Sequence, residues 1–117
     1  MTINDVPEVV IDALGGGYKF IVARLTDERG SERIVIRADE KLGYHDDLLR
    51  ALRREVLLVE PAVPTVRCFG GGRIEINPDQ KTIRIWDSSA AFGEEPDRQQ
   101  TVQMLQTAFP DFQITAI

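Results

Sequence analysis

The stretch "YKFIVARLTDERGSERIVIRADEKLGYHDDLLRALRREVLL", residues 18–58, carries two strand patterns and one helix pattern. Polar and apolar residues alternate over 18–25 and again over 32–38, which is typical of strands whose two faces differ. The polar segment "DERGS", residues 27–31, lies between these runs and predicts a hairpin loop. Leucines then recur at helical spacing toward the end of the stretch. A hairpin followed by an amphipathic helix predicts a sheet with a helix packed against it.

The first strand run also predicts which side chains share a face of the sheet. Phe20 and Val22 lie on one face, whereas Lys19, Ile21 and Ala23 lie on the other. Because Lys19 is near the start of this strand, its ammonium group could reach the rim of the sheet.

The predicted helix within residues 41–58 has one apolar stripe and an ordered charge distribution. Asp46 and Asp47 lie at its front and arginines lie further back, which suits the helix dipole. The segment "EPAVP", residues 60–64, is predicted to end it. The apolar stripe consists of Leu48, Leu49, Leu52 and Val56.

The rest of the chain continues the same mixture of elements. The glycines at 15–17 predict a turn, and "NPDQ" at 77–80 predicts a second hairpin, with proline at its second position. We therefore expect about six strands and two helices in a single domain over residues 1–117, of α+β (α/β) class, with a mixed sheet and the helices packed on its faces. Strand order does not follow from these patterns. The further strands are expected at 8–12, 65–76, 81–87 and 111–117, and the second helix at 94–109.

Composition excludes several classes of protein. Of 117 residues, 43% are hydrophobic and 28% are charged, as in ordinary soluble globular domains. No apolar run approaches the roughly 20 residues that a membrane-spanning helix needs. The net charge of −5 argues against non-specific binding to nucleic acid.

The rare residues limit the chemistry. One cysteine cannot form an internal disulfide, and the N-terminal residues lack the pattern of a secretory signal, so we expect a cytoplasmic protein. One histidine and one cysteine are too few for a usual zinc site, so we expect no metal and no cofactor. We also expect a monomer.

The motif "CFGGGR", Cys68 to Arg73, looks like the loop of a cysteine phosphatase. It has four residues between cysteine and arginine where that loop has five, and a strand pattern follows where that loop opens a helix. Cys68 is therefore better explained as a small hydrophobe in a strand. The three glycines permit a close approach of a ligand to the backbone, or form a bulge at a strand corner. Both interpretations stay open.

His45 is the only histidine, and it lies where the first helix begins. Alone, a histidine at a helix start is usually solvated or a cap. Three cations on or beside the predicted strands, Lys19, Arg37 and Arg73, could converge on it, and the helix start supplies free amide donors that favour a phosphate. This set suggests a small anion site, but sequence patterns do not bring its members together.

The chain resembles the protein histidine phosphatases, also called the janus/ocnus family. The matching motifs occur in the family's order, with near-family spacing, from about Pro7 to the C-terminus. Each motif is weak alone, but the ordered set is specific. They are "YKF" around Lys19, "R-x₇-H" from Arg37 to His45, "YHDD" at 44–47, "C-x-GGGRI" at 68–74, "SSAAFG" at 88–93 and "FPDFQIT" at 109–115.

The resemblance implies metal-free hydrolysis of the P–N bond of phosphohistidine, and of phospholysine, with His45 as the catalytic residue. Its partners would be phosphohistidine-containing proteins or peptides, with inorganic phosphate as product. His45 would act as a general base on water or as the nucleophile. The phosphate-binding residues would be Lys19, Arg37, Arg73, Ser89 and Ala91.

Two departures from the family pattern matter. Gly43 stands where the family often has an acid, and Cys68 stands alone where better-known relatives have more cysteines. The alternative function is therefore a phosphate- or phosphoprotein-binding module of the same fold without turnover.

The electrostatic surroundings predicted for His45 are mixed. Its reference pKa is about 6.5, so much of the imidazole is a free base at pH 7. The helix N-terminus and Arg37 should lower its pKa, whereas Asp46 and Asp47 should raise it.

Overall fold

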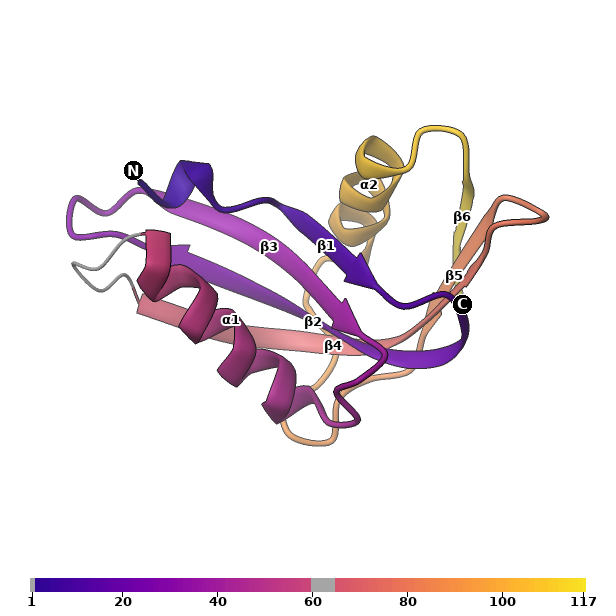
Figure 1. The fold of residues 1–117 in the computed structure, drawn as a ribbon, viewed down its shortest axis with the longest axis horizontal. Coiled ribbons are helices and arrows are strands. Elements are labelled where there is room, and N and C mark those ends of the chain that lie inside the picture. The colour runs from indigo at the N-terminus through magenta and orange to yellow at the C-terminus, as the bar shows by residue number, and fades with distance from the viewer. Residues whose placement is uncertain (1, 60–64) are drawn as a thin grey trace.

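Six strands and two α-helices make up the fold in a computed structural model, which describes residues 2–59 and 65–117 (Figure 1). The predicted helix end at 60–64 lies outside the described residues. In chain order the elements are η1 (Ile3–Asp5), β1 (Val9–Asp12), β2 (Gly15–Thr26), β3 (Glu32–Asp39), α1 (His45–Val59), β4 (Thr65–Asn77), β5 (Thr82–Trp86), α2 (Arg98–Ala108) and β6 (Gln113–Ala116).

The strands form one mixed sheet in the order β1-β3-β2-β4-β5-β6. The two edge strands, β1 and β6, run parallel to their neighbours, and the four inner strands pair antiparallel. The predicted α+β class, with about six strands and two helices, is confirmed.

The predicted hairpin loop joins β2 to β3. Asp27 Oδ1 accepts hydrogen bonds from the amides of Arg29 and Ser31, at 2.9 Å each. Gly30 adopts φ +85°, a conformation that glycine takes without strain. Because this loop is short and locally bonded, the two long strands pair directly.

Each helix covers one face of the sheet (Figure 1). On the α1 face, Ile21 and Ala23 of β2 pack with the apolar stripe of α1. On the opposite face, Phe20 and Val22 pack with Leu105 of α2. The predicted division of β2 into two faces is therefore confirmed. The α1 stripe is buried as predicted, at Leu48, Leu49, Leu52 and Val56.

Two predicted boundaries are wrong. The glycines at 15–17 belong to the start of β2, because positive φ angles at Gly15 and Gly16 let the strand begin only two residues after β1 ends. Helix α2 starts at Arg98 rather than at residue 94. Asp97 caps it by accepting a hydrogen bond from Gln100 N at 3.0 Å.

Strand β4 runs without interruption through the glycine motif. Its pairing with β2 shifts by one residue between Gly70 and Cys68, which leaves Phe69 unmatched and makes the bulge that the glycines suggested. No helix follows Arg73, so the structural requirement of a cysteine-phosphatase loop is not met.

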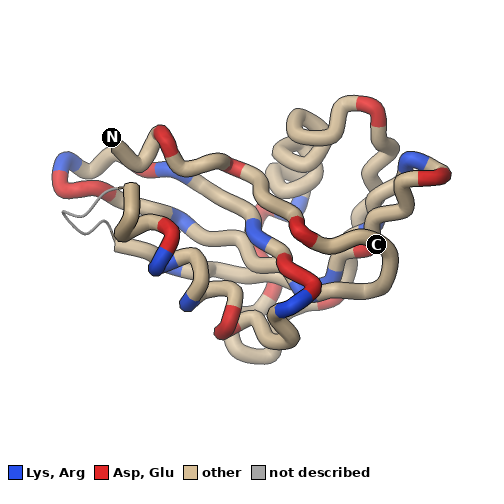
Figure 2. Tube along the Cα trace, in the orientation of Figure 1, with Lys and Arg blue, Asp and Glu red and all other residues tan. Residues whose placement is uncertain are grey.

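Acidic and basic positions are interspersed along most of the trace (Figure 2). Within the described residues, neither helix has the length and hydropathy to cross a bilayer.

Candidate functional site

His45 is the first residue of α1, and its imidazole lies against the glycine run of β4. The residue is 8% exposed. A Cβ added to Gly71 would lie 3.2 Å from His45 Cδ2 and 2.1 Å from Phe20 O, so this strand position admits no side chain. Gly71 therefore lets the His45 side chain and the Phe20 backbone lie close to β4. The close approach of a ligand, which the sequence left open, stays a prediction.

A hydrogen bond to the backbone sets the tautomer of His45. Its Nε2 lies 3.0 Å from Gly72 O. A carbonyl oxygen only accepts, so Nε2 carries the proton and donates. In the neutral imidazole, Nδ1 is then the unprotonated nitrogen, and the structure records no hydrogen-bond partner for it among the described residues. Nδ1 is the basic and nucleophilic atom of the site.

Two of the three predicted cations converge on His45. Lys19 and Arg73 are register partners on β2 and β4, and they share the α1 face with Gly71. Lys19 Nζ lies 4.9 Å from the centre of the Tyr44 ring. Arg73 donates from Nη1 to Gly17 O at 3.2 Å, and its Nε lies 3.6 Å from Asp87 Oδ2. Both cations act electrostatically on the imidazole, which places them near it.

Burial lowers the pKa of His45 below its ordinary value, and Lys19 and Arg73 lower it further. The hydrogen bond to Gly72 and the carboxylate of Asp87 oppose this shift. The sequence predicted opposing influences on this pKa, but the neighbours that exert them differ. Burial, Lys19 and Arg73 lower the pKa, whereas Arg37 was expected to lower it. Asp87 raises the pKa, whereas Asp46 and Asp47 were expected to raise it.

Asp87 is a member of the site that sequence reasoning missed. It follows β5 and adopts φ +68°, which turns the chain out of the sheet beside Arg73. One signal was present, since aspartate is among the few non-glycine residues that adopt this conformation readily. That signal does not say where the carboxylate lies.

Residues 89–93 form a tight loop that is hydrogen-bonded to β4. Gly93 O accepts hydrogen bonds from Gly71 N and from Ser89 N, at 3.1 Å each, which fastens the loop to β4 beside His45. Ser89 Oγ accepts from the amides of Ala91 and Phe92, at 3.3 and 3.1 Å. The hydroxyl keeps one proton that it can donate to a ligand. Two of the five predicted phosphate-binding residues, Ser89 and Ala91, are thus hydrogen-bonded to each other.

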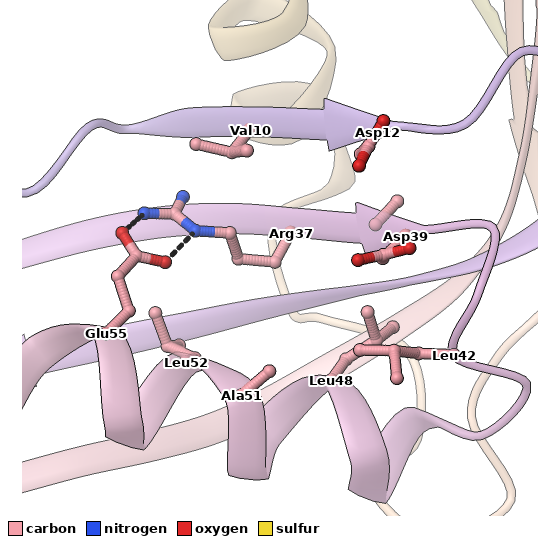
Figure 3. Close-up of a pocket in the computed structure, with 10 residues that line it drawn as sticks. Val10, Asp12, Arg37, Asp39, Leu42, Leu48, Ala51, Leu52 and Glu55 are labelled. Carbon is pink, nitrogen blue, oxygen red and sulfur yellow. Dashed lines mark hydrogen bonds and ion pairs between the residues drawn. The ribbon is translucent and has the colours of Figure 1, made fainter.

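Arg37 does not join this cluster. Its guanidinium forms a two-pronged ion pair with Glu55, through Nε at 2.9 Å and Nη2 at 2.7 Å (Figure 3). It also donates to the carbonyls of Pro7, Glu8 and Ile36. Glu55 lies well along α1 from His45, and Figure 3 shows the arginine pointing toward that part of the helix, at one end of a hollow of about 150 Å³. The contacts of Arg37 are those of a structural residue.

Cys68 lies in the α1-side core. Burial raises the pKa of its thiol to about 11, and Sγ donates to Gly70 O at 3.4 Å. The thiol is therefore protonated at neutral pH, which is unfavourable for a nucleophile. This agrees with the interpretation of Cys68 as a small hydrophobe.

Among the described residues, no three His, Cys, Asp or Glu side chains are grouped so that they could hold a metal ion. Metal-free chemistry remains a prediction from the resemblance.

Gly43 is exposed, and a Cβ there would meet nothing within 4 Å.

Comparison with known proteins identifies the family. The chain is 32% identical over 99 residues to the sex-regulated protein janus-A of Drosophila simulans, which covers 85% of this chain and 70% of that protein. It is 31% identical over 99 residues to janus-A of Drosophila melanogaster, with the same coverage. It is 35% identical over 88 residues to the sex-regulated protein janus-B of Drosophila sechellia, covering 71% of this chain and 57% of that one. The model of the Janus/Ocnus family matches residues 3–113, and this chain therefore belongs to the Janus/Ocnus family.

Proposed function

We propose that this protein is a protein histidine phosphatase that hydrolyses the P–N bond of phosphohistidine without a metal ion. The observation that carries the proposal is the state of His45. Its Nε2 donates to Gly72 O, its Nδ1 has no recorded hydrogen-bond partner among residues 2–59 and 65–117, and its pKa is lowered, so a neutral base is available at pH 7. Lys19 and Arg73 supply positive charge next to it.

Nδ1 of His45 can act in two ways. As a general base it takes a proton from water while the water oxygen attacks phosphorus, and the P–N bond breaks as the substrate's imidazole leaves and is protonated. As a nucleophile it attacks phosphorus and displaces the substrate's imidazole, which is protonated as it leaves, and water then hydrolyses phospho-His45 to inorganic phosphate and free His45. We favour the general base. Label from a ³²P-phosphohistidine peptide that stays on the quenched, denatured enzyme would reveal the nucleophilic route.

The surrounding donors suit a phosphoryl group. Phosphoryl transfer spreads negative charge over three oxygens, so catalysis depends on fixed donors and cations. The Lys19 ammonium, the first amides of α1 and the Ser89 hydroxyl are such groups, and Arg73 adds charge at the rim. Arg37 is left out of this set because its donors are already engaged by Glu55 and backbone carbonyls.

The decisive experiment is an assay of phosphate release from a phosphohistidine peptide in the presence of a metal chelator. His45→Ala should lose about 10²–10⁴-fold in kcat/KM, or more if it is the nucleophile. Cys68→Ser is the matched control and should keep most of the turnover. A folded Cys68→Ser protein without activity, or release that stops when chelator is added, would refute the proposal. Peptide binding without turnover would support the module that only binds phosphate.

A second experiment locates the anion. Inorganic phosphate or sulfate should shift NMR signals of Lys19, His45 and residues 89–91. Shifts confined to another surface would contradict the assignment of the site.

A further inference from the structure

A second charged cluster lies behind the site, on the α2 face of the sheet. Arg98, the first residue of α2, donates from Nη1 to Asp87 O at 2.7 Å and from Nη2 to Gly71 O at 3.0 Å. The same guanidinium pairs with Glu95, at 2.7 Å through Nη2 and 3.3 Å through Nε. Thr101 donates its hydroxyl to Glu95 Oε2 at 2.7 Å.

This cluster is more deeply buried than ordinary surface ion pairs. Glu95 is 1% exposed and the Arg98 side chain is 11% exposed. Removing two charges from water is costly, and such a pair commonly adds little to stability compared with apolar side chains of the same size. Stability alone therefore gives a weak reason for the cluster, and its contacts suggest another.

The glycine run lets the cluster reach the back of the site. A Cβ on Gly70 would lie 2.1 Å from Glu95 N, and a Cβ on Gly72 would lie 2.3 Å from Trp86 O and 3.1 Å from Arg98 Nη2. Gly71, between them, faces His45. At this point only the backbone of β4 separates the arginine from the imidazole.

Arg98 also donates a hydrogen bond to β4 beyond the point where β5 stops pairing with that strand. The pairing of β4 with β5 ends at Arg73 and Trp86. Beyond it, the Gly71 amide donates to Gly93 O and the Gly71 carbonyl accepts from Arg98. The next carbonyl, that of Gly72, accepts from His45. Consecutive peptide groups are thus held by the arginine on one side and the histidine on the other.

We propose that Arg98, oriented by Glu95 and Thr101, is a positioning residue for His45 and for the loop of residues 89–93. Arg98 fixes the Gly71 carbonyl, and the next carbonyl along β4, that of Gly72, accepts from the imidazole. Arg98 also fixes the Asp87 carbonyl, which lies just before the loop. Its catalytic consequence rests on the proposed phosphatase function, whereas its effect on the imidazole does not.

The test uses a paired variant, Glu95→Met with Arg98→Met. Removing both charges leaves neither one buried alone, so the fold should persist while the two carbonyls lose their donor. The chain has one histidine, so one imidazole signal reports the site by NMR titration. Glu95 and Arg98 carry opposite charges and are removed together, so a shift of the His45 pKa mainly reports movement of the site.

We expect the His45 pKa to rise toward its ordinary value, because a loosened site admits water and relieves the burial that lowers it. We expect kcat/KM to fall by roughly 10–100-fold, the loss that a displacement of about 1 Å produces. The matched control, Glu75→Met with Arg84→Met, removes an exposed pair of 2.9 Å on the β4–β5 hairpin and should change neither quantity.

The outcomes separate the two proposals. An unchanged His45 pKa and unchanged kcat/KM in the folded paired variant overturn the positioning role. A pKa shift in a protein without phosphatase activity supports the positioning role and rejects the proposed function. If the paired variant does not fold, Arg98→Lys keeps the charge but cannot span both carbonyls and Glu95. The His45 pKa of the Arg98→Lys protein must then rise as well, and an unchanged pKa in that variant overturns the inference.

Discussion

At the scale of single residues, the site depends on which atom of His45 is left free. The Gly72 carbonyl accepts from Nε2, so Nδ1 keeps the lone pair, and Lys19 and Arg73 lie close enough to act on the imidazole. Burial and these two cations favour the neutral form, and Asp87 moderates them. These few neighbours therefore set the pKa of His45. That pKa decides whether the imidazole is neutral at pH 7 and can still accept a proton.

The first prediction concerns Asp87. Asp87→Asn should lower the His45 pKa, because it removes a carboxylate that raises it, and the acid limb of kcat/KM should move to lower pH. Asparagine tolerates the positive φ at this position and keeps an oxygen for the Ser88 amide. NMR titration and a pH–rate profile measure both effects.

Asp46→Asn is the control for this change, because Asp46 is half exposed and pairs with Arg50 at 3.0 Å. It should move the limb little. A shift of the Asp87→Asn limb to higher pH would contradict the electrostatic account.

The second prediction concerns Lys19. Lys19→Met should raise KM for a phosphohistidine peptide and raise the His45 pKa, because a cation leaves both the phosphate and the imidazole. Arg84→Met, which removes an exposed cation from β5, should do neither. Equal effects of the two substitutions would show that only the overall charge of the protein matters.

At the scale of elements, two arginines on strands of the same sheet have different tasks. Arg73 lies opposite Lys19, next to the end of α1 that begins with His45. Arg37 lies opposite Ile21, and its side chain reaches Glu55 and the carbonyls of the segment before β1. Arg37 thereby ties α1, β3 and the N-terminal segment together.

The third prediction follows from this contrast. Arg37→Leu should lower the free energy of unfolding by about 2–3 kcal/mol, because it leaves Glu55 and several carbonyls without their donor. Arg50→Leu, which removes an exposed pair on α1, should cost less than about 0.5 kcal/mol. Chemical denaturation measures both. The folded Arg37→Leu protein should keep its kcat/KM, and a large loss there would return Arg37 to the site.

At the scale of the whole molecule, the site is built across the sheet rather than on one side of it. His45 and the α1 core occupy one face, and Arg98 with the α2 core occupies the other. The side-chain-free part of β4 brings them together.

The fourth prediction is a pH dependence of stability. The folded-state pKa of His45 lies below its ordinary 6.5, so the unfolded chain binds the proton more readily. The free energy of unfolding should therefore fall as pH drops below about 6.5 and level off below the folded-state pKa. His45→Gln, which can still donate to Gly72 O, should lose less stability between pH 8 and pH 5. Denaturation curves at both pH values give the comparison, and parallel losses would show that His45 titrates alike in both states.

Local pattern was sufficient for the elements, whereas the candidate site residues followed from the resemblance to a family. The alternation in residues 18–25 assigned side chains to the two faces of β2, because the strand period is two whatever surrounds it. His45 was placed at a helix start, and Cys68 in a strand, for equally local reasons. Boundaries that depend on a single residue's φ, such as the start of β2 at Gly15, were missed.

The tertiary structure alone decided which cations reach the imidazole. Arg37 and Arg73 are both strand arginines in a sheet, and only pairing register and the direction of α1 separate the one beside His45 from the one beside Glu55. Asp87, Glu95 and Arg98 entered through contacts across β4 that no sequence period encodes. Periodicity reports the face on which a side chain lies, whereas convergence depends on how distant segments pack, and that is a property of the folded chain.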